Sequence, residues 1–111
     1  MKNKIILVLI FILADLGTGL LKAIQSGTYT SSKMREGLFH KLAELASVAF
    51  GYLCDYALPI IGVELPVRLA SGVIVYVIIM ECGSIIENIG VMSPSLGKYL
   101  SGVFEKVKND D

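Results

Sequence analysis

Six ionisable residues stand inside long apolar stretches of this sequence, where a charge is costly. They are Asp15, Lys22, Glu44, Asp55, Glu81 and Glu87. A charge at the centre of a membrane helix costs about 2.5–3.5 kcal/mol on insertion scales, so such residues persist only when they face protein or water or stay neutral. Asp15, Asp55 and Glu81 lie deepest. We therefore expect them to act in function or assembly, and to switch between a paired or neutral resting environment and a hydrated one.

Small and polar residues accompany these charges at helical spacing. At about 100° per residue, each apolar stretch carries its polar residues on one stripe. The stripes are Asp15, Thr18, Gly19 and Lys22; Glu44, Ser47, Gly51, Cys54 and Asp55; and Glu81, Ser84, Glu87 and Asn88. Small residues permit close helix approach and polar ones can bond across helices. Three helices are too few to enclose a wide aqueous path, so the stripes predict a homo-oligomer.

Two of the six charges also have a plainer explanation. Glu44 is near the end of its apolar stretch, and Lys22 is long enough to extend its ammonium to the lipid head groups. Asp15 and Lys22 are separated by two helical turns, so they are expected to pair between subunits and not within one helix.

The stretches that carry the stripes are long enough to cross a membrane. They cover residues 5–24, 42–63 and 69–92, and about 20 helical residues cross a bilayer core. Helices also satisfy their own backbone in lipid. The sequence predicts an all-α integral membrane protein with three transmembrane helices in a single domain, residues 1–111.

The N-terminus permits a second interpretation. Lys2 and Lys4 before the apolar run from Ile5 to Ala14 imitate a secretory signal peptide. No small-x-small cleavage site follows that run, and apolar residues resume at Leu20. We therefore expect a retained first helix.

The connections predict two amphipathic helices at the membrane interface. The polar segment 25–32 should end the first helix, and Ser32 can cap a short interfacial helix that leads into the second span. Pro59 should kink or end that span. After Ser93-Pro94, a C-terminal helix over about 94–108 is apolar at positions Leu96, Tyr99, Leu100, Val103 and Val107. It is expected on the membrane surface; packing onto a soluble partner is the alternative.

The basic residues predict an orientation. With three spans, the first loop and the C-terminal tail share one side of the membrane. That side carries the interfacial residues Lys33, Arg35, Lys41, Lys98, Lys106 and Lys108, and the other carries Lys2, Lys4 and Arg68. Since cytoplasmic loops are richer in Lys and Arg, the N-terminus is expected outside and the C-terminus inside the cell.

Composition argues against several functional classes. Hydrophobic residues form 54% of the chain and charged residues 18%, with ten basic and ten acidic side chains in balance. This leaves no basic field for nucleic acid. Cys54, Cys82 and His40 show no metal-ligand spacing, and no P-loop or nucleophile–base motif is present. We expect neither enzymatic activity nor a metal or cofactor.

Four ordered sequence islands carry a family resemblance. They are DLGTGLLKA at 15–23, SSKMREGLFHK at 31–41, the lone Asp55, and ECGSIIENIG at 81–90 followed by Pro94 and Leu96. Together they resemble the toxin-secretion and phage-lysis holin family of small phage and bacterial membrane proteins. The resemblance spans residues 15–96 and implies membrane and assembly positions, with no catalytic residues.

A holin, as the resemblance implies, oligomerises in the bacterial cytoplasmic membrane. Its lesions collapse the proton-motive force and release an endolysin, or in some relatives a toxin, without necessary direct contact. The expected partners are therefore the lipid bilayer and further copies of the chain. Three alternatives stay open: an antiholin or regulator that binds a holin, a small ion channel, and an accessory subunit of a larger membrane complex.

Overall fold

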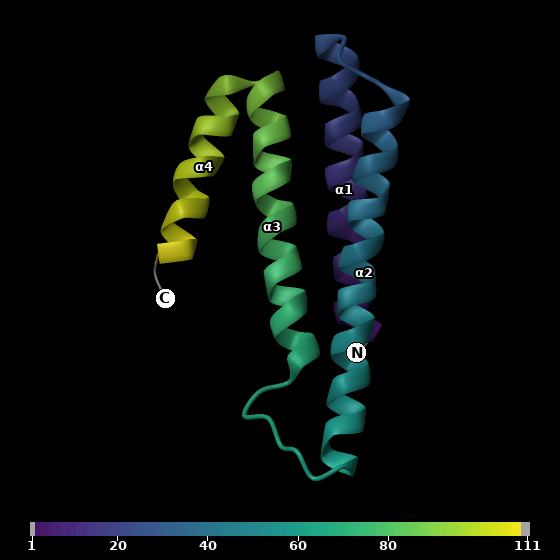
Figure 1. The fold of residues 1–111 in the computed structure, drawn as a ribbon. Helices are drawn as coiled ribbons and strands as arrows, with labels where there is room; N and C mark the ends of the chain where they lie inside the picture. The colour runs from purple at the N-terminus through teal and green to yellow at the C-terminus, as the bar shows by residue number, and fades with distance from the viewer. Residues whose placement is uncertain (1, 110–111) are drawn as a thin grey trace.

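Four helices form the described part of the chain, residues 2–109, in a computed structural model; side-chain positions are described through residue 107. They are α1 (Lys2–Ser26), α2 (Ser31–Ile60), α3 (Leu69–Met92) and α4 (Pro94–Asn109). The chain reverses direction at each connection, so α1 and α3 run the same way and α2 and α4 run back (Figure 1). The all-α prediction is confirmed for these residues.

The first connection follows from local turn chemistry. Gly27 has a φ of 68°, which glycine adopts without strain, and the amide of Thr28 donates to the Ala23 carbonyl at 2.9 Å. The predicted end of the first helix is therefore confirmed. The cap of the next helix is Thr30, whose hydroxyl accepts from the Lys33 amide at 3.2 Å. The prediction of Ser32 as the cap was wrong by two residues.

The second helix is continuous. A separate interfacial helix before a second span was predicted, but α2 runs without a break over 30 residues from Ser31 to Ile60. Pro59 occupies its last turn, as expected for a residue that ends the helix. Beyond it, Gly62 has a φ of 85° and Val63 donates to the Leu58 carbonyl at 2.9 Å. The predicted interfacial helix and the predicted second span are thus parts of one long helix.

The number of candidate membrane spans is two, where three were predicted. Among the described residues, α1 and α3 are long and apolar enough to cross a membrane. Helix α2 does not meet this criterion, because Glu44, Asp55 and the tyrosines on either side of Asp55, Tyr52 and Tyr56, lower its mean hydropathy. The predicted spans 5–24 and 69–92 match α1 and α3 closely, whereas the last residues of the predicted span 42–63 lie in the connection beyond α2.

Helix α3 is the centre of the structure. It packs against α1, α2 and α4, whereas α1 and α2 have little contact with each other. The buried apolar core joins three helices through Val8 and Ile12 of α1, Val48 of α2, and Ile74 and Val77 of α3. Most other large apolar side chains of α1 to α3 are exposed, as expected for helices whose outer faces contact lipid.

Helix α4 begins at Pro94, as predicted, and folds back along α3 (Figure 1). The two helices approach through glycines: a Cβ built on Gly97 would lie 2.3 Å from the Cα of Gly90. Because this glycine face meets α3, most of the predicted apolar stripe of α4 is left exposed, at Leu96, Tyr99, Val103 and Val107. Its contact with a membrane surface stays a prediction.

A glycine contact also sets the approach of α2 to α3, and it supplies a stability test. A Cβ on Gly51 would lie 2.8 Å from the Cα of Ala70, whereas Gly17 of α1 has open space around it. We predict that Gly51→Ala lowers the free energy of unfolding by about 1–3 kcal/mol through overpacking. Gly17→Ala should raise it by up to about 1 kcal/mol through helix propensity. Unfolding in detergent, followed by circular dichroism, checks both; equal effects would contradict the packing described.

Candidate functional site

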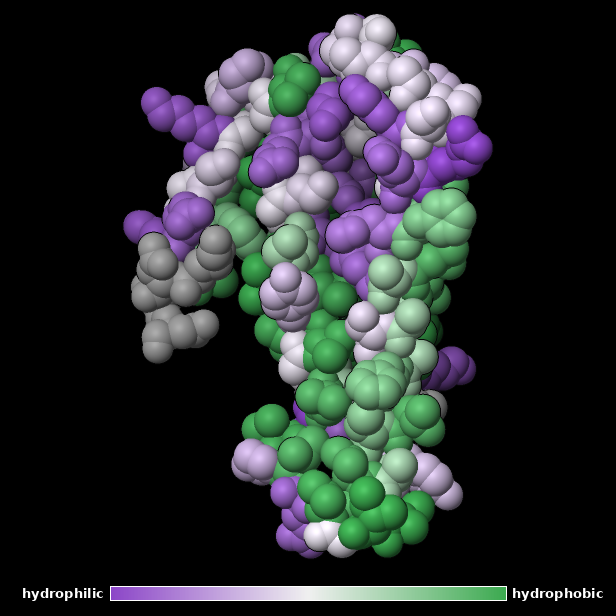
Figure 2. Space-filling model, in the orientation of Figure 1, coloured by the Kyte–Doolittle hydropathy of each residue, from purple (hydrophilic) through white to green (hydrophobic). Residues whose placement is uncertain are grey.

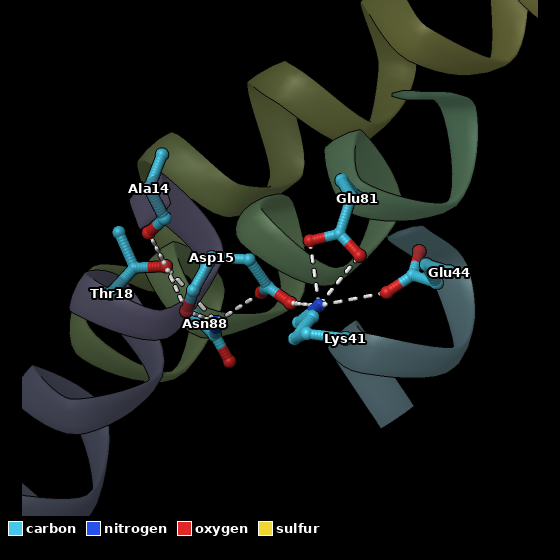
Figure 3. A network of polar contacts seen from close by, with 7 residues as sticks. All are labelled: Ala14, Asp15, Thr18, Lys41, Glu44, Glu81 and Asn88. Carbon is cyan, nitrogen blue, oxygen red and sulfur yellow. Dashed lines mark hydrogen bonds and ion pairs between the residues drawn. The ribbon is translucent and has the colours of Figure 1, made fainter. Parts of the chain in front are cut away.

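One buried ammonium group joins three helices. Lys41 of α2 has a side chain only 10% exposed. Its Nζ donates to Asp15 Oδ2 of α1 and lies 2.6 Å from each carboxylate oxygen of Glu81 on α3 (Figure 3). Since α1 and α2 otherwise scarcely touch, this cation is a principal link between them. We call Lys41, Asp15, Glu81 and Glu44 the charge cluster.

Glu44 makes the charge cluster electrically uneven. Its Oε1 lies 3.6 Å from Lys41 Nζ, within ion-pair distance, yet it is buried without a hydrogen-bond partner among the described residues. Three carboxylates therefore surround one ammonium, a formal excess of two negative charges when all are ionised. A buried excess of one sign is costly. The charge cluster thus favours any rearrangement that brings water or positive charge to its carboxylates.

Amide and hydroxyl groups extend the charge cluster between α1 and α3. Asn88 donates from Nδ2 to Asp15 Oδ1 and to Thr18 Oγ1, both at 3.0 Å. The Thr18 hydroxyl in turn donates to the Ala14 carbonyl at 2.9 Å. Both Asp15 oxygens therefore have partners. Gly19 lies alongside, where an added Cβ would be 3.5 Å from Asn88 Nδ2, so a small residue leaves room for this amide.

The polar stripes of α1 and α3 thus meet within one chain. Within the single chain Asp15 pairs with Lys41, and the prediction that the stripes turn toward neighbouring subunits stays a prediction. Polar residues gather over one half of the bundle's length, beside the connection from α1 to α2, while the other half is largely apolar (Figure 2). The charge cluster belongs to the polar half.

Lys41 was predicted to lie at the interface, and that prediction was wrong. Its residue surface is only 8% exposed. In the sequence Lys41 has Leu38 before it and Leu42 and Leu45 after it, at the polar edge of an apolar stretch. Only the packing of α2 against α1 and α3 buries it. One signal could have found it: the buried acids need a cation, and Lys41 precedes Glu44 by one helical turn.

Asp55 has a different role from the one predicted. Its carboxylate accepts from the Leu69 amide at 2.6 Å and from the Ala70 amide at 3.0 Å. It therefore caps the first turn of α3, where Arg68 offers no side-chain cap. This contact lies at the opposite end of α2 from its Thr30 cap and does not involve the charge cluster. The prediction that Asp55, like Asp15 and Glu81, switches between a paired or neutral environment and a hydrated one stays a prediction.

The remaining predicted site residues are spread over the surface of the polar half. Lys22 and Ser84 are half-buried and line a crevice described below. Glu87 is exposed on α3. The predicted interfacial residues with exposed side chains are Lys33, Arg35, Lys98 and Lys106. The side chain of Lys108 lies outside the described residues.

Among the described residues, two helices are long and apolar enough to cross a membrane, and charges are buried between them. The comparison with known families identifies the chain further: the model of the bacteriophage holin family matches residues 1–109. The chain belongs to this family. It is also similar to an uncharacterized protein of Halalkalibacterium halodurans, 29% identical over 105 residues that cover 95% of this chain and 78% of the relative. No solved structure matches it.

The charge cluster makes a direct prediction about stability. Lys41→Met leaves Asp15 and Glu81 buried without their cation, and breaking a buried pair in this way costs about 3–5 kcal/mol. Lys33→Met removes an exposed charge eight residues earlier on α2 and should change the free energy of unfolding by less than about 0.5 kcal/mol. Denaturant titration in detergent compares them. Equal stability of the two variants would show that Lys41 does not hold the helices together.

Proposed function

We propose that this protein is a holin that oligomerises in the bacterial cytoplasmic membrane. Its lesions are non-selective, collapse the proton-motive force and release an endolysin, or a toxin, to lyse the host cell. Membership of the bacteriophage holin family supports this proposal, as do two helices able to cross a membrane. The observation that carries it is the charge cluster, because it stores within one chain the polar groups that a water-filled lesion needs on its walls.

The closed bundle is the resting state in this proposal. Asp15 and Glu81 are satisfied by Lys41 and Asn88, while apolar side chains cover the outside of α1 and α3. A chain in this form can accumulate in lipid without admitting water. When α2 separates from α1 and α3, the same charges become available to water and to neighbouring chains.

We further propose that the N-terminus lies outside and the C-terminus inside the cell, an orientation that requires α2 to cross the membrane together with α1 and α3. Helices α1 and α3 run in the same direction and α2 returns the chain between them (Figure 1). The connection from α1 to α2 and the start of α4 therefore lie at one face. That face carries Lys33, Arg35 and Lys98, while Lys2, Lys4 and Arg68 lie at the other face. With Lys41 withdrawn into the bundle these basic residues are equal in number, so the proposed orientation rests on the lysines that the C-terminal tail adds in the sequence, Lys106 and Lys108.

Inducible expression in a bacterium tests the proposal. Membrane potential and turbidity are followed with and without a cytoplasmic endolysin that lacks its own signal sequence. We expect a delayed, sudden depolarisation, with turbidity loss only when the endolysin is present. A steady potential with continued growth would contradict lesion formation and indicate an antiholin or accessory subunit. Graded, ion-selective currents would indicate a channel.

The charge cluster should set the delay before depolarisation. Glu81→Gln weakens the hold on Lys41, whereas Glu87→Gln removes an exposed carboxylate from the same helix and serves as the matched control. Each loss of about 1.4 kcal/mol from the closed state raises the opened fraction about tenfold. We therefore predict earlier depolarisation with Glu81→Gln and with Asp15→Asn, and an unchanged delay with Glu87→Gln at equal expression. Equal delays in all of these variants would contradict the resting state proposed.

A further inference from the structure

A crevice of about 590 Å³ opens between α1 and α2, on the side of the charge cluster that faces their connection. It exists because both helices pack on α3 but have little contact with each other. Its walls come from Asp15 to Ala23 of α1 and Lys33 to Lys41 of α2, and the connecting residues 28–30 close one end. Its volume lies within the usual range for sites that hold small molecules.

The crevice contains positive charge that no protein group balances. Lys22 of α1 is half-buried and Lys33 of α2 is exposed, and neither forms an ion pair with any carboxylate in the part of the chain that the structure describes. Lys41 and Asp15, at the inner wall, already pair with each other. A half-buried, unpaired ammonium at the head-group level of a helix able to cross a membrane gains from a nearby anion, and no carboxylate of the described residues supplies one to Lys22.

The other polar groups at the crevice fit a phosphate ester. His40 and the hydroxyls of Thr28 and Tyr29 line it and can donate hydrogen bonds. One more carboxylate lines the crevice, that of Glu36, which does not belong to the charge cluster. Because Glu36 is exposed, water screens its charge. Among the lining side chains outside the charge cluster, the free charge is therefore positive: Lys22 and Lys33 against Glu36.

The apolar surroundings distinguish between a free anion and a lipid. Leu20, Leu21 and Ile24 of α1 are exposed beside Lys22, at 37%, 58% and 63% of their surfaces. They lie near the end of a helix that is apolar enough to cross a membrane, at the level where acyl chains meet head groups. A free phosphate would use none of this surface, whereas the chains of a phospholipid would cover it.

We propose that this crevice binds the phosphate of an anionic phospholipid head group, with Lys22 and Lys33 as its counter-charges. Basic pockets between helices are suited to such head groups. The bound lipid bridges α1 and α2 on the open side of the charge cluster and so stabilises the closed bundle. The inference rests on the membrane placement of α1 and not on lesion formation, so lipid binding and lysis can fail separately.

Purified full-length protein in a neutral detergent tests the site. Phosphatidylglycerol or phosphatidylcholine is added at equal concentration, and thermal unfolding and retained lipid, the latter by native mass spectrometry, are measured. We expect phosphatidylglycerol alone to raise the unfolding temperature and to remain bound. Lys22→Gln and Lys33→Gln should weaken its retention about tenfold or more. Lys98→Gln, an exposed lysine of α4 outside the crevice, should leave it unchanged.

Two further experiments show whether the bound phosphate belongs to a lipid or to a free anion, and whether a loss of binding reflects misfolding. Glycerol phosphate without acyl chains should neither raise the unfolding temperature nor displace the lipid; displacement at equal concentration would show a free-anion site and overturn the lipid assignment. Lys22→Arg keeps the charge and should retain the lipid, which separates loss of binding from loss of fold. Equal retention by wild type, Lys22→Gln and Lys33→Gln would overturn the proposal.

Discussion

The interaction on which the structure depends is the contact of one ammonium with carboxylates from two other helices. Lys41 is buried between Asp15 and Glu81, and there is little other contact between α1 and α2. In an apolar surrounding, removal of Lys41 leaves the carboxylates as uncompensated charge. Lys41 is therefore the polar contact that couples all three helices. Apolar packing around Val8 and Val77 aligns the helices, but it does not distinguish one rotation of them from another as sharply as this ion pair does.

The same contact explains how a chain with polar stripes can rest among lipids. The stripes of α1 and α3 face each other with Lys41 between them, so the surface is largely apolar over the half of the bundle away from the connection between α1 and α2 (Figure 2). Polar contacts of this kind give specificity at the expense of stability, and they can exchange their partners for water or for another chain. Glu44 has a buried oxygen that accepts no hydrogen bond in the described structure, so it is the member of the charge cluster whose polar atoms are least satisfied.

Much of the fold could be predicted from the sequence because its signals are local. Each of these signals affects only the neighbouring few residues, and each predicted a helix boundary closely. They are the polar run before Ser31, the proline in the last turn of α2 and the Ser93-Pro94 pair. Helical spacing also placed Asp15 with Thr18, and Glu81 with Asn88, on single stripes. The number of candidate spans was wrong because α2 combines apolar length with enough polar residues to keep its hydropathy low.

The rest of the site depends on tertiary geometry that spacing does not contain. Lys41 has the sequence surroundings of an interfacial lysine, and only the rotation of α2 against α1 and α3 buries it. Asp55 has the sequence surroundings of a membrane-embedded acid. The connection after Gly62, however, brings the first amides of α3 to its carboxylate. Which charge meets which partner is settled by the relative rotation and register of the helices. Neither follows from the stripes alone.

The most direct test of this account is a double-mutant cycle on the time of depolarisation. Wild type, Lys41→Met, Glu81→Gln and the double variant are expressed at equal levels, and the delay before the membrane potential collapses is measured for each. If the ion pair holds the bundle closed as a unit, the double variant should be no earlier than Lys41→Met alone, since Glu81→Gln then removes a carboxylate that Lys41→Met has left without its cation. Delays that shorten independently and additively would contradict the account.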